Sequence, residues 1–270
     1  MKHAFVYWKN LEKRLKNGHV FLFLDYDGTL TPIVKRPDDA IIPLKTRNLL
    51  KRICGSERIK IAVISGRALW DIRKRVGLKD IIYAGNHGLE IAGIRKTGFI
   101  CPISHNHKIA VKRIKKKLIA KLLGIKGAII EDKGISLSVH YRMTDITDVI
   151  KVKSIVNEVA GIYVAEGTIQ VKAGKKVMEI QPASEWNKGK IVLCLIEKRA
   201  AWNKKMLPLY LGDDATDEDA FSALKNKGLC VLVGGPRRTC AEYYLKNTRE
   251  VHEFLERLLK IREDTTLCRN

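Results

Sequence analysis

Hydrophobic and polar positions divide the start of the chain into two segments of different texture. Over residues 4–16, apolar side chains recur at helical spacing, and an Asn-Gly pair follows as a stop signal. The next run, residues 20–24, is continuously apolar and is bounded by turn-forming residues. A short run of this kind is typical of a strand buried on both faces of a parallel sheet.

The same pairing of a helical pattern with an apolar strand pattern recurs along the chain. Helices are predicted over 44–54, 68–76, 188–199 and 216–226, and strands over 60–65, 80–88, 208–214 and 228–234. Strands that alternate with helices imply right-handed crossovers and an open parallel sheet with helices on both faces. Sheets of this α/β class place their active sites at the carboxyl ends of the strands.

Residues 104–182 have a different texture. A basic helical pattern comes first, and its run KRIKKK at 112–117 is interpreted as a solvated helix face. Alternating strand patterns follow at 134–142, 161–167 and 168–174, with a helical pattern over 145–160 between them. The prediction is therefore a discontinuous core of residues 1–103 and 183–270, interrupted by an inserted α+β domain over 104–182.

Composition adds one unusual feature to this picture, the net charge. Hydrophobic content of 46% and charged content of 30% are ordinary for a folded domain, so wholesale disorder is not expected. The net charge of +22 favours anionic partners, such as phosphate esters, nucleic acids or acidic lipid surfaces, without choosing among them. The charge therefore leaves a second class of protein open beside an enzyme: one that keeps this fold but binds nucleic acid or acts as a regulator. A salt-sensitive gel shift without enzymatic turnover would favour that second class.

The cysteines and the hydropathy pattern bear on location. The six cysteines form no CxxC pair, so no zinc ribbon or dithiol redox motif is present, and isolated thiols suit a reducing cytosol. No run approaches the roughly 20 apolar residues that a membrane span needs. The chain is therefore expected in the cytoplasm, without membrane association.

Carboxylates gather where predicted strands end. Asp25 and Asp27 come directly after the buried strand, in DYDGTLTP, and GDDATDEDAF contributes Asp213, Asp214 and Asp217 after a later strand. Acids held this closely need a cation or a shared proton to relieve their repulsion. Oxygen ligands of this kind suit a hard divalent cation, so a Mg²⁺ site is predicted. No GxxxxGK[ST] stretch occurs, which sets a P-loop kinase aside.

These motifs resemble those of the haloacid dehalogenase superfamily of phosphotransferases. The DxDGT motif matches residues 25–29, Ser65 in VISGR fits the second motif, Lys188 fits the third, and Asp213 with Asp214 or Asp217 fits the fourth. The resemblance implies a Rossmann-like core with a cap, a nucleophile at Asp25, and catalytic roles for Asp27, Ser65 and Lys188. It also implies Mg²⁺ as cofactor, with Asp25, Asp27, Asp213 and Asp214 as its expected ligands.

The resemblance, together with side-chain chemistry, implies a role for each of these positions. The Asp25 carboxylate can attack phosphorus to form an aspartyl-phosphate. Asp27 can protonate the leaving oxygen and later accept a proton from water. Lys188, the Ser65 hydroxyl and the metal would hold the charge that grows on the phosphoryl oxygens.

Within that superfamily the chain resembles the trehalose-6-phosphate phosphatases. The matching stretches include YAGNHGLE, EDKGISLSVHYR, GKKVMEIQP and WNKGK, and several of them lie outside the general catalytic motifs. The resemblance implies hydrolysis of trehalose 6-phosphate to trehalose and phosphate under a mobile cap. A related phosphatase acting on sucrose 6-phosphate or mannosyl-3-phosphoglycerate is the alternative.

By the same resemblance, polar residues of the cap and the cleft would bind the substrate. The expected partner is a small-molecule sugar phosphate, with no nucleic acid and no membrane; the oligomeric state is unknown, with a monomer expected. Purely structural roles stay open for four residues: Glu131 and Lys133 as exposed hairpin charges, Arg142 as the partner of a surface acid, and His87 as a structural histidine. Lys175 is the alternative to Lys176 as the residue that binds the sugar. The candidate substrate-binding residues are Arg67, His87, Glu131, Lys133, Arg142, Lys176 and Glu179.

Overall fold

A computed structural model describes residues 1–93, 104–199 and 206–267 of the chain, which forms two compact units. The core unit combines Met1–Phe99 with Trp186–Asn270, and the inserted unit is Ile100–Glu185. The first border was expected after residue 103, at the end of a segment that lies outside the described residues. The second border was expected after residue 182, and the inserted unit ends at Glu185. Within the described residues, no helix combines the length and the apolar character needed to cross a bilayer.

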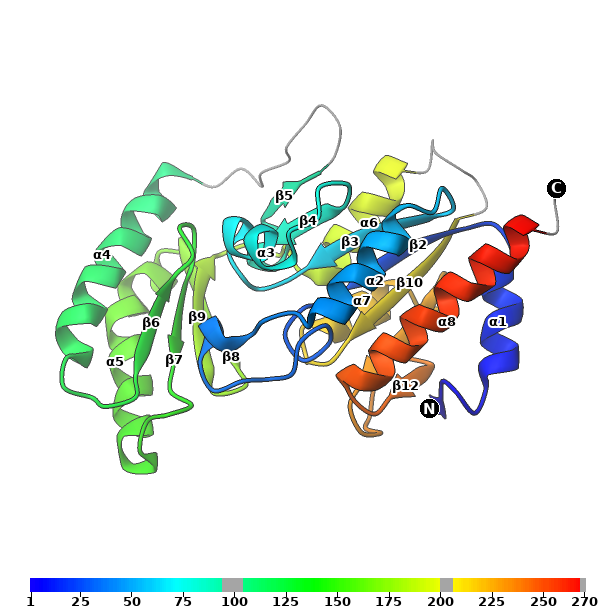
Figure 1. Cartoon of the computed structure of the whole chain (residues 1–270). Coiled ribbons are helices and arrows are strands. Elements are labelled where there is room, and N and C mark those ends of the chain that lie inside the picture. Colours follow the sequence, from blue (N-terminus) through cyan, green and yellow to red (C-terminus); the bar gives the residue numbers. More distant parts are fainter. Residues whose placement is uncertain (94–103, 200–205, 268–270) are drawn as a thin grey trace. The chain divides into compact units, whose positions relative to one another are not determined.

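In the described part of the core unit, an eight-stranded sheet runs parallel except for its last strand, which is antiparallel to its neighbour (Figure 1). This confirms the predicted α/β class and its open parallel sheet. The spatial order is β1 (Lys2–His3), β12 (Tyr243–Leu245), β11 (Leu229–Val233), β10 (Met206–Gly212), β2 (His19–Leu24), β3 (Ile59–Ile64), β4 (Ile82–Gly85) and β5 (Glu90–Ala92).

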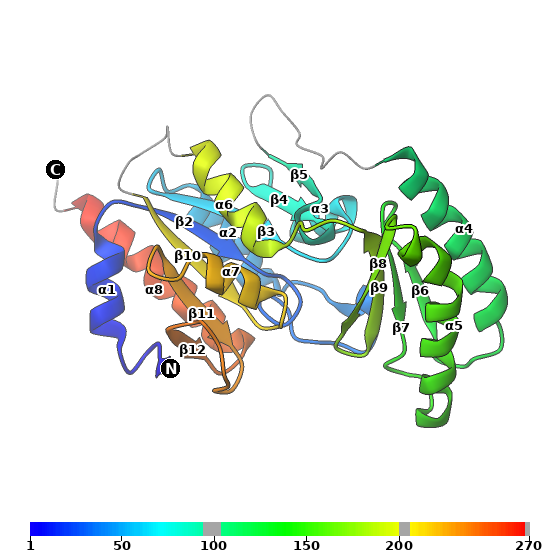
Figure 2. The same ribbon diagram turned by 180° about the vertical axis from the view of Figure 1, so that it is seen from behind.

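Helices cover both faces of this sheet, as Figures 1 and 2 show from opposite sides. Side chains alternate along β2, so that Leu22 and Leu24 join the apolar cluster on one face and Phe21 and Phe23 join the cluster on the other. The first face packs against α1 (Trp8–Lys16), α2 (Leu44–Cys54), α3 (Leu69–Val76) and α8 (Thr248–Leu267). The second packs against α6 (Lys188–Arg199) and α7 (Asp217–Ala223). Burial of β2 on both faces explains its unbroken apolar run.

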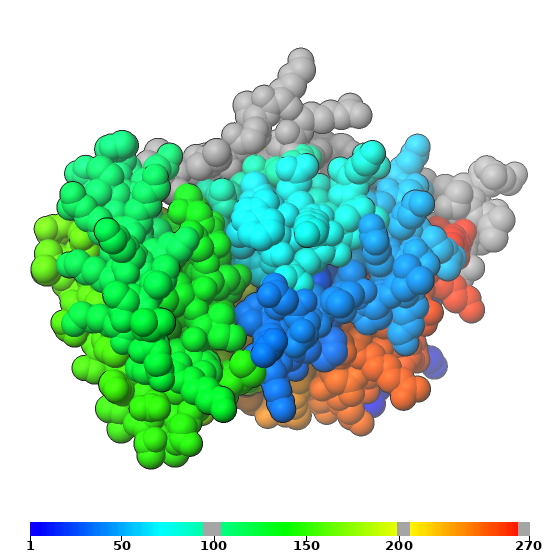
Figure 3. Space-filling view, turned by 60° about the vertical axis from the view of Figure 1, so that its left-hand side comes forward, coloured from blue at the N-terminus to red at the C-terminus, as the bar shows by residue number. Residues whose placement is uncertain are grey.

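The inserted unit is an α+β layer pair. Its antiparallel sheet has the order β6 (Ile129–Asp132), β7 (Leu137–His140), β9 (Val177–Pro182) and β8 (Ile169–Gly174). The helices α4 (His105–Leu122) and α5 (Ile146–Ala165) bury their apolar sides, among them Ile114 and Val156, against one face of that sheet. The outer side of α4, blue-green in Figure 3, exposes Lys112, Lys116 and Lys117.

One strand prediction in the inserted unit is wrong. Residues 161–167 were expected to alternate as a strand, but α5 continues through Ala165 and Gly167 follows it in the left-handed region, with φ 66°. The physical reason is packing: Val152, Val156 and Val159 are buried along α5, and Tyr163 packs onto the same cluster at helical spacing. Burial of that stripe outweighs the β preference of the short segment.

The sequence also missed short elements at the sheet edges. The strands β1, β5 and β12 have two or three residues each, too short to give a clear alternation pattern. The segment expected to remain a strand to residue 88 ends at Gly85 and becomes a 3-10 turn, η2 (Asn86–Gly88). This turn helps to shape the edge of the sheet at the carboxyl end of β4.

Candidate active site

Four neighbouring parallel strands of the core unit end at one edge of the sheet. In spatial order they are β10, β2, β3 and β4, and the residues that follow them are Asp213, Asp25, Ser65 and Asn86. The backbone N–H of Asp25 donates to the carbonyl of Leu211 at 3.0 Å, which fixes the end of β2 against β10. The sheet therefore brings together motifs that lie far apart in the sequence.

Lys188 holds two carboxylates at this edge. It is the first residue of α6, only 2% of it is exposed, and its Nζ lies 2.7 Å from Oδ1 of both Asp25 and Asp217. The Tyr210 hydroxyl also donates to Asp217, at 2.8 Å. Burial disfavours the ammonium, but the carboxylates of Asp217 and Asp25 outweigh it and raise the pKa of Lys188 well above its usual range. Lys188 is therefore a fixed positive charge in the site.

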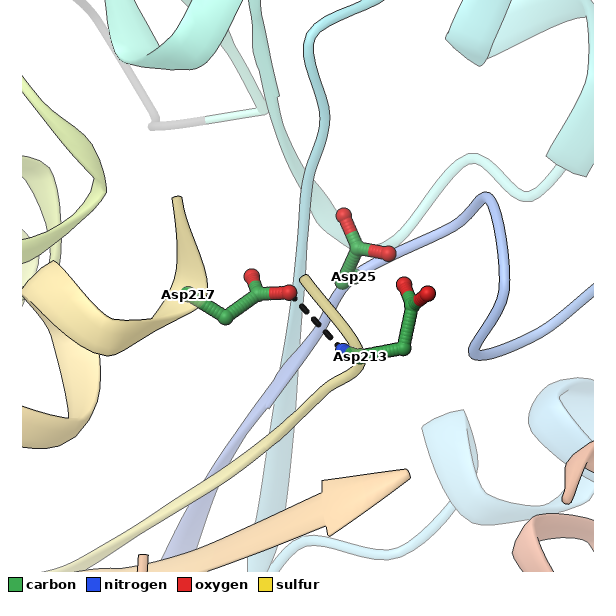
Figure 4. Close-up of side chains that lie close together, drawn as sticks. All are labelled: Asp25, Asp213 and Asp217. Atoms are coloured by element: carbon green, nitrogen blue, oxygen red, sulfur yellow. Dashed lines mark hydrogen bonds between the residues drawn. The ribbon is translucent and has the colours of Figure 1, made fainter. Parts of the chain in front are cut away.

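Three carboxylates converge closely enough to share a cation. Oxygen atoms of Asp25, Asp213 and Asp217 all lie within 4.8 Å of one another, and Figure 4 shows these side chains together. Burial raises the pKa of Asp25 well above its usual range; Lys188 opposes this shift, and the neighbouring acids reinforce it. A divalent cation would relieve this crowding, and carboxylate oxygens are the ligands that a hard cation takes. The three residues are close enough to share such an ion, and both Asp217 oxygens already accept hydrogen bonds from neighbouring groups.

Asp217 also shapes the loop that carries Asp213. Its Oδ2 accepts from the backbone N–H of Asp213 at 2.9 Å and from that of Asp214 at 3.0 Å. The Asp214 carboxylate accepts from the N–H and the hydroxyl of Thr216 at 2.8 and 2.7 Å, and its Oδ1 lies 4.0 Å from Nζ of Lys188. Although burial acts to raise it, Lys188 and Thr216 lower the pKa of Asp214 to about 2. The converging group therefore contains Asp217, which the motif had left as the alternative to Asp214.

Gly28 permits the close approach of the two loops. Its φ is +94°, and a Cβ built on it would overlap the Asp213 carboxylate. Only glycine satisfies both the left-handed backbone and this contact. The glycine of the DxDGT motif thus makes room for one of the three converging acids.

Asp27 faces a different neighbour from Asp25. Its two carboxylate oxygens accept from Nε and Nη2 of Arg67 at 2.7 and 2.6 Å, in the bidentate geometry of a strong ion pair. Arg67 is 6% exposed and also donates to Asp71 and to the carbonyl of Pro37. The structure therefore places Arg67, a predicted substrate-binding residue, on the predicted acid–base carboxylate.

Ser65 and His87 lie at the ends of the next two strands. Ser65 is buried, its hydroxyl oxygen accepts from the N–H of Arg67 at 3.1 Å, and its carbonyl accepts from the N–H of His87 at 2.9 Å. His87 adopts φ 55°, and its ring lies so close to Gly66 that a Cβ there would overlap it. The indole N–H of Trp186 donates to the Gly88 carbonyl at 2.7 Å, which ties this turn to the segment before Lys188.

Three predicted residues of the inserted unit lie on or beside the face of its sheet that is opposite the helices. Strand pairing sets Glu131 opposite Ser138 and Ser138 opposite Glu179, so these side chains share one face. The Lys133 ammonium lies 3.2 Å from Glu179, and Nε2 of His140 lies 2.7 Å from Glu131. Three of the predicted residues, Glu131, Lys133 and Glu179, are thus brought together.

Arg142 and Lys176 lie near one hairpin end of the inserted unit instead. An Nη2 N–H of Arg142 donates to the carbonyl of Lys175 at 2.8 Å, and Lys176 occupies the turn between β8 and β9 with φ 68°. Sequence reasoning missed Ser138 and His140. The alternation of GISLSVHYR did contain a signal, because it sets Ser138 and His140 on the face opposite to Leu137 and Val139.

Comparison with known proteins gives a consistent family. A sequence profile described as trehalose-phosphatase matches residues 23–248. A probable trehalose-phosphate phosphatase D of Arabidopsis thaliana is 35% identical over 269 residues, covering 95% of this chain and 72% of the relative. A probable trehalose-phosphate phosphatase 4 of Oryza sativa is 33% identical, with 94% and 69% covered.

Solved structures give the same result. The C-terminal domain of the Candida albicans trehalose-6-phosphate phosphatase matches with a TM-score of 0.79 and 26% identity, covering 93% of this chain and 96% of that one. A haloacid dehalogenase-like hydrolase of Bacteroides thetaiotaomicron matches with a TM-score of 0.61 and 18% identity, covering 89% and 99%. This second likeness bears on the fold alone.

Proposed function

Since the chain belongs to the trehalose-phosphatase family, we propose that it hydrolyses trehalose 6-phosphate to trehalose and inorganic phosphate. The observation that carries this proposal is the family match over residues 23–248, which spans the strand-end motifs and the whole described part of the inserted unit. The expected class, a phosphatase of the haloacid dehalogenase fold, agrees with it. A chain that kept only the fold would not need Asp25, Lys188 and Asp217 in one buried group.

The first chemical step is assigned to Asp25 and Asp27. An Asp25 oxygen forms a bond to phosphorus while the bond from phosphorus to the sugar oxygen breaks, and the electron pair of that bond stays on the sugar oxygen. That oxygen takes a proton from Asp27. In the second step a water molecule loses a proton to Asp27 and displaces phosphate from Asp25. One difficult displacement is thereby divided into two easier ones.

Lys188 and Ser65 are proposed to stabilise the phosphoryl group. Lys188 is held in place by its two carboxylate partners, so its charge is preorganised and needs little rearrangement during the reaction. Ser65 lies at the end of the neighbouring strand, where its hydroxyl can turn toward a phosphoryl oxygen.

Asp25, Asp213 and Asp217 are proposed to hold the cofactor, which we take to be Mg²⁺. When bound, the ion supplies positive charge against the charge that develops on the phosphoryl oxygens. Asp27 and Asp214, which the resemblance implies as further ligands, stay predicted ligands; their carboxylates accept hydrogen bonds from Arg67 and Thr216.

The inserted unit is proposed as the cap that reads the sugar, through the polar face formed by Glu131, Lys133 and Glu179. Carboxylates accept hydrogen bonds from sugar hydroxyls, and lysine donates to them. The remaining proposed substrate-binding residues are Arg67, His87, Arg142 and Lys176. We also propose a monomer in the cytoplasm; the free thiols of Cys54, Cys194, Cys230 and Cys240 support a reducing compartment.

A substrate panel tests the proposed function. Phosphate release is measured with trehalose 6-phosphate, sucrose 6-phosphate, mannosyl-3-phosphoglycerate and glucose 6-phosphate. We expect turnover of trehalose 6-phosphate that a chelator abolishes and added Mg²⁺ restores, because the acidic cluster needs its cation. A preference for another ester would reassign the substrate and leave the mechanism standing, whereas turnover that ignores the chelator would remove the metal site.

Substitution of Glu131 tests the role of the cap. For Glu131→Gln we expect kcat/KM for trehalose 6-phosphate to fall roughly 5- to 150-fold, which corresponds to a loss of about 1–3 kcal/mol of transition-state stabilisation. The reason is that a buried sugar hydroxyl loses the carboxylate that accepts its hydrogen bond. Cleavage of p-nitrophenyl phosphate should be unchanged, because it has no sugar. The matched control is Asp132→Asn, an exposed neighbour on the other side of the same strand. Equal loss on both substrates would place Glu131 in folding instead.

A further inference from the structure

Acidic and basic side chains alternate in a hydrogen-bonded network that runs from Asp27 to α3. Arg67 binds both oxygens of Asp27 and, through Nη1, donates to Asp71 at 3.0 Å. Arg75 binds Asp71 from the other side, with Nε 2.8 Å from each carboxylate oxygen. The sequence order of the network is therefore acid, arginine, acid, arginine.

Two of these groups come from α3: Asp71 and Arg75 stand four residues apart, so helical spacing sets their side chains one above the other. Arg67 precedes the N-cap Ala68 and reaches Asp71 from the turn before the helix. The 8% exposure of Asp71 leaves it little water, and its charge is balanced by the guanidinium groups on either side. Losing either arginine would leave a buried acid partly compensated.

The outer end of the network is anchored on the segment after the catalytic motif. Nη1 of Arg75 donates to the carbonyls of Asp38 and Ala40, both at 3.1 Å. The Ala40 carbonyl also accepts from the hydroxyl of Tyr26, the residue between the two catalytic aspartates, at 2.9 Å. The Arg67 guanidinium lies 5.4 Å from the centre of the Tyr26 ring. Both ends of the network thus return to the DxDGT motif.

Asp27 and Asp25 have different neighbours, and this difference indicates what the network does. Among the described residues, the carboxylates that converge as a possible metal site are those of Asp25, Asp213 and Asp217, while Asp27 is held by Arg67. Two carboxylates that are two residues apart in sequence are thereby given different neighbours. Asp25 faces the cluster, and the other is kept for proton transfer.

We propose that Asp71 and Arg75 are positioning residues that act through Arg67 to orient the Asp27 carboxylate for proton transfer. The proposal rests on the proposed phosphatase function, and specifically on its first step. Once the proton of Asp27 has moved to the leaving oxygen, the ionised carboxylate is the form that Arg67 binds at two points. The same anchor then holds that carboxylate as the base for the attacking water.

Leaving groups that differ in their need for a proton separate this role from a structural one. Phenyl phosphate and p-nitrophenyl phosphate have similar shapes, but the nitrophenolate departs readily without a proton. The ratio kcat/KM covers only the steps through the first displacement, so it is not affected by the later attack of water. Neither compound carries a sugar, so the comparison does not depend on the substrate assignment.

For Asp71→Asn we expect kcat/KM for phenyl phosphate to fall about tenfold, a part of what general acid catalysis contributes, while p-nitrophenyl phosphate changes less than about twofold. Asp71→Glu should recover part of the loss, because it restores a carboxylate between the arginines. Arg75→Gln should show the same selectivity with a smaller loss, since Asp71 remains. Asp27→Asn sets the full size of the effect, and Arg73→Gln, an exposed arginine of the same helix, is the matched control.

Equal losses on the two aryl phosphates in Asp71→Asn, or no loss on either, would overturn the proposal. Thermal unfolding of each variant shows whether it is folded, and Arg75→Gln provides the test if Asp71→Asn does not fold. Failure of the substrate assignment would show separately, as absence of trehalose 6-phosphate turnover in the wild type with the leaving-group selectivity intact.

Discussion

Replacing Asp25 by asparagine is expected to abolish phosphatase activity, with a loss of on the order of 10⁴-fold or more, as for the removal of other covalent nucleophiles. The amide has nearly the same volume as the carboxylate but is a poor nucleophile toward phosphorus. Activity is measured as phosphate release from trehalose 6-phosphate by purified protein. The matched control is Asp39→Asn, which changes the same charge at an exposed position of the core unit. Retained activity in Asp25→Asn would remove the nucleophile assignment.

The melting temperature of Asp25→Asn tests whether the buried Asp25 carboxylate destabilises the folded protein. Burial raises the pKa of Asp25 in the folded protein, so the folded state binds this proton more tightly than the unfolded chain. The ionised group therefore costs stability as the pH rises from the usual carboxyl pKa through the raised one. Without metal at neutral pH, Asp25→Asn should melt at the same temperature as the wild type or higher. A large fall in melting temperature would mean that the carboxylate serves the fold.

Replacing Lys188 by methionine is expected to have the second largest effect, on stability as well as activity. The buried carboxylates of Asp25 and Asp217 would lose their shared cation, and breaking a buried ion pair of this kind costs about 3–5 kcal/mol. Loss of a preorganised charge at the phosphoryl group should lower kcat by about 10²- to 10³-fold. Denaturant unfolding measures the first quantity, and single-substrate kinetics measure the second.

A double-mutant cycle makes this prediction specific. Lys188→Met combined with Asp25→Asn should be less destabilised than Lys188→Met alone, because one of the two stranded carboxylates is gone. The matched control is Lys225→Met, an exposed lysine of the core unit, for which a change below about 0.5 kcal/mol is expected. Strict additivity in the cycle would mean that Lys188 and Asp25 do not interact energetically.

The inserted unit contains one element that the sequence pattern predicted correctly and one that it predicted wrongly. Its basic helix was predicted correctly, because Val111, Ile114, Leu118 and Leu122 repeat at helical spacing, and all four are buried in α4. The strand predicted at 161–167 was wrong, because a short β-branched segment suits either structure and only burial against neighbouring strands decided for the helix. Local preference is a small energy compared with the burial of a side-chain stripe.

The site shows the same division at the level of single residues. The resemblance to the haloacid dehalogenase motifs implied roles for Asp25, Asp27, Ser65 and Lys188. Asp25, Asp27 and Ser65 also stand at the ends of predicted apolar strands, whereas Lys188 has no such local signal. The choice between Asp214 and Asp217 remained open, because both follow the same strand. It depends on which carboxylate the loop turns inward, and the hydrogen bonds of Asp217 to Lys188 and Tyr210 are contacts between distant parts of the chain.

Periodicity and local turn chemistry are enough to predict the α/β class, the order of most strands and helices, and the residue types at the strand ends. Three contacts follow from the folded arrangement alone: Arg67 binds Asp27, Asp71 and Arg75 continue that network, and Asp217 lies beside Asp25 and Asp213. These outcomes depend on which strands are neighbours and on how side chains share limited space and charge. Spacing along one chain does not contain that information.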